Sequence, residues 1–206
     1  MSFRLFPEDV LFEQRLLSCG GFNPGKLDGQ YGPKTRAAED AAYKSYLDIQ
    51  KKMGAFDARS EKAIQTLLPE MQRKARMILA IGLKRERDNS IHCAILSGTR
   101  TYAEQNKLYK IRPKVTNAGP GQSNHNFGIA LDVGLFKGAK YLTGANRAEE
   151  KAYADFAAAV KAEVHDIEWG GDWVSFKDAP HYQHVTGKSL GEVRRLFEQG
   201  AAFISG

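Results

Sequence analysis

Cysteine is scarce in this chain of 206 residues, and long apolar stretches are missing. Its two cysteines, Cys19 and Cys93, lie far apart and outside any Cys-x-x-Cys pair. This pattern excludes a disulfide scaffold and favours two buried free thiols in a reduced folding environment. No stretch approaches the roughly 20 apolar residues that a membrane-spanning helix needs, so no transmembrane segment is expected.

The N-terminus lacks the pattern of a secretory signal. Residues 1–10 carry Glu8 and Asp9 and contain no apolar core run, whereas a signal peptide has a basic start followed by 7–15 apolar residues as a rough rule. If the substrate lies outside the cytoplasm, we expect another route to deliver the protein there.

Basic residues outnumber acidic ones only after residue 58. The formal net charge is +6. Residues 1–58 hold eight basic and eight acidic residues, and the remainder holds 22 basic and 16 acidic. A basic surface favours an anionic polymer, although it can also be a solvated face only. Runs of five basic residues and nucleic-acid motifs are absent, so we expect wall polymers or membrane surfaces rather than nucleic acid.

The first segment predicts a small all-α domain over residues 1–55. Apolar spacing indicates a helix over 10–17, which the Gly- and Pro-containing residues 19–25 end. Residues 28–33 form a turn, and a second helical pattern covers 35–46. We take the polar stretch 51–58 as the linker.

The second segment, residues 59–206, mixes helices and strands without regular βαβ alternation. This predicts an α+β domain with a small, mostly antiparallel sheet flanked by helices. Ser60 is the expected N-cap of the first helix, and Pro69 suits the first turn of the next, whose apolar stripe is Met71, Ala75, Ile78 and Leu79. The expected helices cover 61–67, 69 onward, 101–109, 147–164 and 189–199, and the expected strands cover 91–96, 129–136, 167–169 and 181–185.

Strand alternation sets one carboxylate apart from the core. Ile129, Leu131, Val133 and Leu135 point to one face, whereas Ala130, Asp132 and Gly134 point to the other. Small neighbours keep the face around Asp132 clear for a metal or a substrate. Gly128 allows the preceding loop to turn, so that His125 folds back beside Asp132.

A second histidine with a carboxylate follows a glycine- and tryptophan-rich turn. His181 comes three residues after Asp178. Two histidines and one carboxylate are a common ligand set for catalytic zinc, which leaves a position for water. We therefore predict Zn²⁺ at His125, Asp132 and His181. His184 is less suited, since residues three apart on a strand face opposite sides.

The motifs of the second segment resemble the M15 metallopeptidases. Ser-x-His-x-x-Gly-x-Ala-x-Asp spans 123–132, Trp-Gly-Gly-Asp-Trp spans 169–173, and Asp-x-Pro-His spans 178–181. Ser97-Gly-Thr-Arg100 is similar to the family's Ser-Gly-x-Arg segment. The resemblance implies a fold of the hedgehog and D-Ala-D-Ala peptidase type. The aspartate at 178 and the Trp-Gly-Gly-Asp-Trp motif resemble the L-alanyl-D-glutamate endopeptidase branch in particular.

Further roles are expected for four residues around the metal. Asp178 is the expected proton acceptor, Arg100 the group that steadies substrate or oxyanion, and Ser123 and Trp173 the further substrate contacts. Three of the four have a plainer alternative. Asp178 can be a turn former before Pro180, Arg100 can pair with a surface carboxylate, and tryptophans commonly wall a cleft.

The first segment resembles a PG-binding-1 type of peptidoglycan-binding domain. The similarity covers Leu16-Leu17 and residues 21–35, and it departs after Ala38, where Glu39 and Asp40 intervene. The fold therefore carries over more safely than tight wall binding. We expect residues 59–206 to hold the whole metal site and to fold without residues 1–55.

Together these features predict a monomeric zinc peptidase that cuts the peptide stem of bacterial peptidoglycan, most specifically the L-alanyl-D-glutamate bond. The missing signal fits a phage-type endolysin, an antimicrobial enzyme of host lysis that is made in the host cytoplasm and released by a holin-type pore or another export route. One alternative is a D-Ala-D-Ala carboxypeptidase or dipeptidase. Another is a non-catalytic wall-binding protein with a vestigial site.

Overall fold

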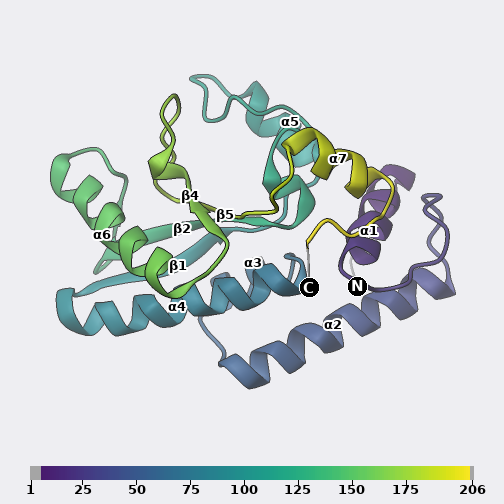
Figure 1. Cartoon of the computed structure of the whole chain (residues 1–206), viewed down its shortest axis with the longest axis horizontal. Coiled ribbons are helices and arrows are strands. Elements are labelled where there is room, and N and C mark those ends of the chain that lie inside the picture. Colours follow the sequence, from purple (N-terminus) through teal and green to yellow (C-terminus); the bar gives the residue numbers. More distant parts are fainter. Residues whose placement is uncertain (1–5, 205–206) are drawn as a thin grey trace.

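A small antiparallel sheet lies at the centre of the chain (Figure 1). The computed structural model describes residues 6–204, apart from the side chains of 88 and 89. The strands are β1 (Ile91–Ser97), β2 (Ala130–Lys137), β3 (Lys140–Leu142), β4 (Ile167–Trp169) and β5 (His181–His184). Their order is β1-β2-β5-β4, with β3 paired to β2, and every pairing is antiparallel. The α+β prediction with a mostly antiparallel sheet is confirmed.

Helices flank this sheet and extend beyond it. They are α1 (Pro7–Cys19), α2 (Pro33–Met53), α3 (Ala58–Ile64), α4 (Pro69–Asn89), α5 (Tyr102–Lys110), α6 (Arg147–Glu163) and α7 (Leu190–Glu198), with short 3-10 turns η1 (Asn124–Phe127) and η2 (Gly170–Asp172). In Figure 1, α4 runs beneath the sheet with α2 beyond it, and α5 lies on the opposite side. Within residues 6–204, no helix is both long and apolar enough to cross a membrane.

The core forms where the sequence pattern placed it. The α4 stripe of Met71, Ala75, Ile78 and Leu79 packs with Leu131, Val133 and Leu135 of β2 in one buried cluster. Because these β2 side chains fill the core face, the alternate residue Asp132 points to the other face of the sheet. The face opposite α4 therefore carries the candidate site.

Two local expectations are corrected by the structure. Ser60 is not the N-cap of α3, because Asp57 accepts the hydrogen bond from the amide of Ser60 at 3.0 Å. The Ser60 hydroxyl is buried and accepts from the amide of Ile95 at 2.9 Å. The linker predicted over 51–58 is also shorter, since helices occupy all of that range except residues 54–57.

A buried ion pair fastens this short link to α4. Arg76, which is 1% exposed, donates to both carboxylate oxygens of Glu61 at 2.8 Å and to the carbonyl of Gly54 at 2.7 Å. The hydroxyl of Tyr46 and the amide of Phe56 donate to the same carboxylate at 2.6 and 2.8 Å. Burial opposes ionisation of Glu61, but these donors outweigh it and lower its pKa to about 2.

This pair predicts a specific loss of stability in acid. The pKa of Glu61 is depressed in the folded chain, so its stabilisation is complete above the ordinary value of 4.5 and is lost as the pH falls toward about 2. We expect a contribution on the order of 2 kcal/mol once partial exposure is allowed for. Denaturant unfolding of wild type and Glu61→Gln between neutral pH and the acid limit measures it.

Glu61→Gln is expected to be less stable than the wild type at neutral pH and to lose less of its unfolding free energy on acidification. Glu70→Gln is the matched control, because Glu70 forms an exposed pair with Arg73 at 3.3 Å. If acidification lowered the free energy of unfolding equally in the wild type and in Glu61→Gln, other carboxylates would cause the acid sensitivity.

The first two helices share cores with the rest of the chain. Phe12 of α1 packs in a cluster with Leu68, Phe127 and Phe197. Tyr46 of α2 belongs to the main core beneath the sheet. Packing therefore crosses the sequence-based boundary between residues 1–55 and 59–206.

Both cysteines are free and half-buried, and burial raises the pKa of each thiol to about 12. Their thiolates are therefore scarce near neutral pH, which suits packing roles rather than reactive ones.

Candidate metal centre

A turn before β2 positions the first candidate ligand. Ser123 caps η1, with its hydroxyl accepting from the amide of His125 at 3.4 Å. Gly128 ends the turn with a φ of +71°, a left-handed conformation that favours glycine. A side chain there would also meet Leu68 at 3.0 Å. The chain consequently reverses as the sequence predicted, and it returns His125 toward Asp132.

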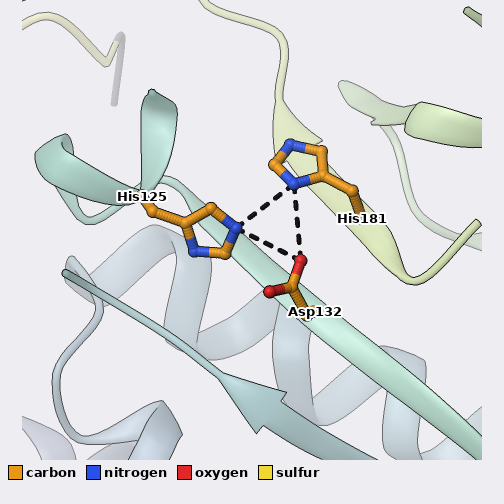
Figure 2. A group of neighbouring side chains, drawn as sticks. All are labelled: His125, Asp132 and His181. Carbon is orange, nitrogen blue, oxygen red and sulfur yellow. Dashed lines mark hydrogen bonds and ion pairs between the residues drawn. The ribbon is translucent and has the colours of Figure 1, made fainter. Parts of the chain in front are cut away.

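Sheet register brings the other two ligands together. Asp132 of β2 and His181 of β5 are direct partners in the antiparallel pairing. His125 Nε2 lies 3.2 Å from Asp132 Oδ1 and 3.2 Å from His181 Nδ1. The third side of this triangle, from His181 Nδ1 to Asp132 Oδ1, is 3.5 Å (Figure 2). The structure therefore joins the three predicted ligands, which come from η1, β2 and β5, in one group.

The size of this triangle fits zinc. Zinc bonds to histidine nitrogen and carboxylate oxygen of about 2.0–2.1 Å in a tetrahedron give ligand–ligand edges of about 3.3–3.4 Å. The observed edges of 3.2–3.5 Å bracket that value. Three tetrahedral positions would thus be filled by protein, which leaves the fourth for a water molecule or substrate.

Hydrogen bonds on the outer side of each histidine ring also indicate a metal site. His125 Nδ1 lies 2.7 Å from the carbonyl of Gly98, which can only accept, so Nδ1 carries the proton. His181 Nε2 lies 3.0 Å from the amide oxygen of Gln183 and donates to it. In the neutral rings the inward nitrogens then present lone pairs, both facing a carboxylate oxygen. Three atoms with lone pairs that converge on one point form the ligand set of a cation site.

Burial and charge set the ionisation of the three ligands. Burial lowers the pKa of His125, which favours its neutral, metal-binding form. Burial works against ionisation of Asp132, but His125, His181 and Arg100 outweigh it and hold its pKa well below the ordinary range. For His181 burial opposes the charged form, but the nearby Asp132 and Asp178 carboxylates and Gln183 outweigh it and raise the pKa.

Arg100 lies on the outer side of the Asp132 carboxylate. Its guanidinium donates to Asp132 Oδ2 and, at 3.0 Å, to the hydroxyl of Ser97. The backbone holds it in place, since its amide donates to the carbonyl of His125 at 3.0 Å. Here Arg100 pairs with the carboxylate of the candidate ligand Asp132 rather than with a surface carboxylate, and its contact with substrate stays a prediction.

Asp178 lies on the loop that leads into β5. Its amide donates to the carbonyl of Gly170 at 3.0 Å, and its own carbonyl accepts from the amide of His181 at 3.1 Å. A side chain at Gly170 would come within 2.6 Å of that carbonyl, so glycine permits the close turn. Burial and the charge of Asp132 raise the pKa of Asp178. A raised carboxyl pKa suits an acid–base group at neutral pH.

Trp173 covers one side of the centre. Its ring centroid lies 4.9 Å from that of His181, and its indole N–H donates to Glu168. Ser123 acts in the structure as the cap of η1. Substrate contacts of Ser123 and Trp173 remain predictions.

His184 is directed away from the triangle. Its Nδ1 lies 2.7 Å from the ammonium nitrogen of Lys74, a buried lysine that also donates to the carbonyls of His165 and Asp166 at 2.8 and 2.9 Å. Strand alternation had placed His184 opposite His181, and the ligand group accordingly omits it.

Two residues beside the centre were missed by the sequence reading. Gln183 accepts from His181, and Glu168 accepts from Gln183 at 2.9 Å. One signal could have found Gln183, because it lies two residues after His181 on the same strand and so shares its face.

Comparison with known proteins first gives a class. Residues 116–184 match the M15 peptidase family model described as D-alanyl-D-alanine carboxypeptidase. This range contains His125, Asp132, Asp178 and His181, but not Arg100.

Two individual proteins are also similar. The chain is 36% identical over 106 residues to the peptidoglycan L-alanyl-D-glutamate endopeptidase CwlK of Bacillus subtilis (strain 168), a match that covers 48% of this chain. It spans 64% of that relative, slightly less than two thirds of its length. The crystal structure of the Serratia marcescens L-Ala D-Glu endopeptidase ChiX is 27% identical, with a TM-score of 0.47 over 63% of this chain and 88% of ChiX.

Proposed function

We propose that this chain is a zinc-dependent peptidase that hydrolyses the peptide stem of bacterial peptidoglycan at the L-alanyl-D-glutamate bond. The observation that carries the proposal is the triangle of three inward-facing acceptor atoms with edges of 3.2–3.5 Å. The M15 match over the same residues and the likeness to CwlK support the reaction and the bond.

The chain's own residues supply the remaining chemistry. Bound by His125, Asp132 and His181, zinc would act as a Lewis acid on the scissile carbonyl and lower the pKa of water to about 7. Asp178 takes the proton from the attacking water and passes it to the departing amine. Arg100 holds Asp132 through Oδ2, so that Oδ1 stays turned inward.

The cleaved bond is tested by mass analysis of muropeptides after digestion of purified peptidoglycan. New L-alanine C-termini and D-glutamate N-termini are expected. Release of terminal D-alanine would instead establish the carboxypeptidase activity after which the matched family model is described. If the metal-loaded protein left the muropeptides unchanged, the result would favour the alternative of a non-catalytic wall-binding protein.

Metal content gives a separate prediction. We expect about one zinc per chain in protein never exposed to chelator, and loss of that zinc in His125→Gln, because two remaining ligands hold zinc poorly. His92→Gln is the matched control, since His92 lies on β1 and stacks on Phe136 at 5.0 Å. Elemental analysis decides the matter, and a metal-free wild type would contradict the site.

Wall binding and delivery complete the proposal. Residues 1–55, which lie outside the family match, would hold the enzyme on the wall and raise its local concentration there. The enzyme would have a phage-type role and act as a monomer. Release from the host cytoplasm by a holin or another export route would bring it to its substrate in the wall. Lysis of host cells on co-expression with a holin, but not without one, tests that role.

A further inference from the structure

Gln183 joins the metal ligand His181 to a carboxylate on the next strand. Gln183 is the register partner of Ala130 on β2 and of Glu168 on β4. His181 and Gln183 share a face of β5 because they are two residues apart. His181 Nε2 lies 3.0 Å from Gln183 Oε1, and Gln183 Nε2 lies 2.9 Å from Glu168 Oε2. The three side chains therefore form a continuous hydrogen-bonded row.

Donor and acceptor chemistry fixes the direction of this row. A carboxylate such as that of Glu168 accepts hydrogen bonds, and its other oxygen already accepts from the indole N–H of Trp173. Gln183 must therefore turn its amide nitrogen toward Glu168 and its amide oxygen toward His181. The side-chain amide of Asn124 donates to the same Gln183 oxygen at 2.8 Å, which supports this orientation.

This orientation determines which nitrogen of His181 carries the proton. An acceptor at Gln183 Oε1 stabilises the proton on Nε2, and the lone pair then lies on Nδ1. Nδ1 is the nitrogen that faces His125 and Asp132. The same carboxylate holds Trp173, whose ring covers His181, so one group supports both the tautomer and the ring position.

We propose that Gln183 and Glu168 are positioning residues, which fix the Nε2–H tautomer of His181 and so keep Nδ1 available as a metal ligand. The proposal rests on the metal centre of the proposed function and adds two residues outside its ligand and acid–base groups. Outer partners of metal-binding histidines commonly change metal affinity by about 10–100-fold.

The first test removes the acceptor but keeps the volume. Gln183→Met retains a side chain of similar length without a strong hydrogen-bonding group. We expect Zn²⁺ affinity, measured by competition with a chromogenic chelator, to fall by about 10–100-fold. Thermal unfolding of the metal-free protein reports separately whether the variant is folded.

The second test exchanges the two partners. Gln183→Glu alone places two carboxylates face to face and is expected to weaken the row, because like charges repel. Combined with Glu168→Gln, the new glutamine can donate to the new glutamate and still accept from Trp173. We expect the double variant to bind Zn²⁺ within about threefold of wild type and more tightly than Gln183→Glu, a rescue that independent losses would not give.

A spectroscopic measurement tests the tautomer without metal. Nitrogen-15 NMR of the histidine rings at about pH 9 should show a larger fraction of the Nε2–H tautomer of His181 in the wild type and in the exchanged pair than in Gln183→Met. In Gln183→Met the Asp132 carboxylate, 3.5 Å from Nδ1, is the acceptor that remains, so the proton is expected to shift toward Nδ1. Wild-type zinc affinity in Gln183→Met, or an exchanged pair no tighter than Gln183→Glu, would overturn the proposal. A wild type without zinc affinity would overturn the proposed function, and the NMR signals would still decide whether Gln183 sets the tautomer.

Discussion

Replacing Asp178 with asparagine is expected to lower kcat by about 10²–10⁴-fold while zinc remains bound, which is the range over which a positioned acid–base group acts. The amide fills nearly the same volume but cannot take a proton from water. Burial and the charge of Asp132 raise the pKa of Asp178, which is the direction that suits a group that accepts and returns a proton. Turnover of a soluble muropeptide and the zinc content of the same preparation measure the two effects.

A matched control lies six residues earlier. Asp172 is exposed and forms an ion pair with Lys161 at 2.6 Å, so Asp172→Asn should keep nearly all activity. If Asp178→Asn also kept most of its activity, Asp178 would be a turn former and another group would accept the proton. Loss of zinc from Asp178→Asn would show that it supports His181 instead.

Local patterns predicted the elements that bear the site because their signals are short in range. Alternation along residues 129–135 identified the buried face of β2 and separated Asp132 from it, and the three buried β2 residues of the main core agree. The left-handed Gly128 and the turn that returns His125 are likewise encoded within a few residues. These features need no knowledge of distant parts of the chain.

Local sequence patterns could not predict the hydrogen-bond partners that strand register brings together. The row from His181 through Gln183 to Glu168 depends on β4 and β5 pairing in one register, with Glu168 opposite Gln183. Ser60 shows the same limit, because its hydroxyl satisfies the amide of Ile95, 35 residues away, instead of capping its own helix. Both contacts join segments whose proximity only the folded chain establishes.

The pairing of Glu61 with Arg76 was also missed, since charge counts do not reveal which residues become buried. The pair closes the short link between α2 and α3 against α4. A polar stretch that the sequence presents as a linker thus becomes a fixed junction.

Phe12→Ala is expected to reduce the free energy of unfolding of the whole chain by about 3–5 kcal/mol, the usual range for a buried phenylalanine. The Phe12 ring is 9% exposed and lies 5.4 Å from the ring of Phe197 and 5.8 Å from that of Tyr102, measured between centroids. Phe197 in turn lies 5.3 Å from Phe127, which is two residues after His125 in η1. The cavity would therefore open beneath the turn that holds His125, a candidate metal ligand.

Denaturant unfolding at neutral pH measures the loss, and Phe6→Ala is the control, because Phe6 is 62% exposed at the start of the same helix. By the same packing we expect a chain that begins at residue 59 to be markedly less stable than the whole chain, since it would expose Leu68, Phe127 and Phe197. If the shortened chain unfolded with the free energy of the whole chain and Phe12→Ala matched Phe6→Ala, residues 59–206 would fold independently, as the sequence pattern indicated. If both were destabilised, the first two helices would be part of the support for the metal centre.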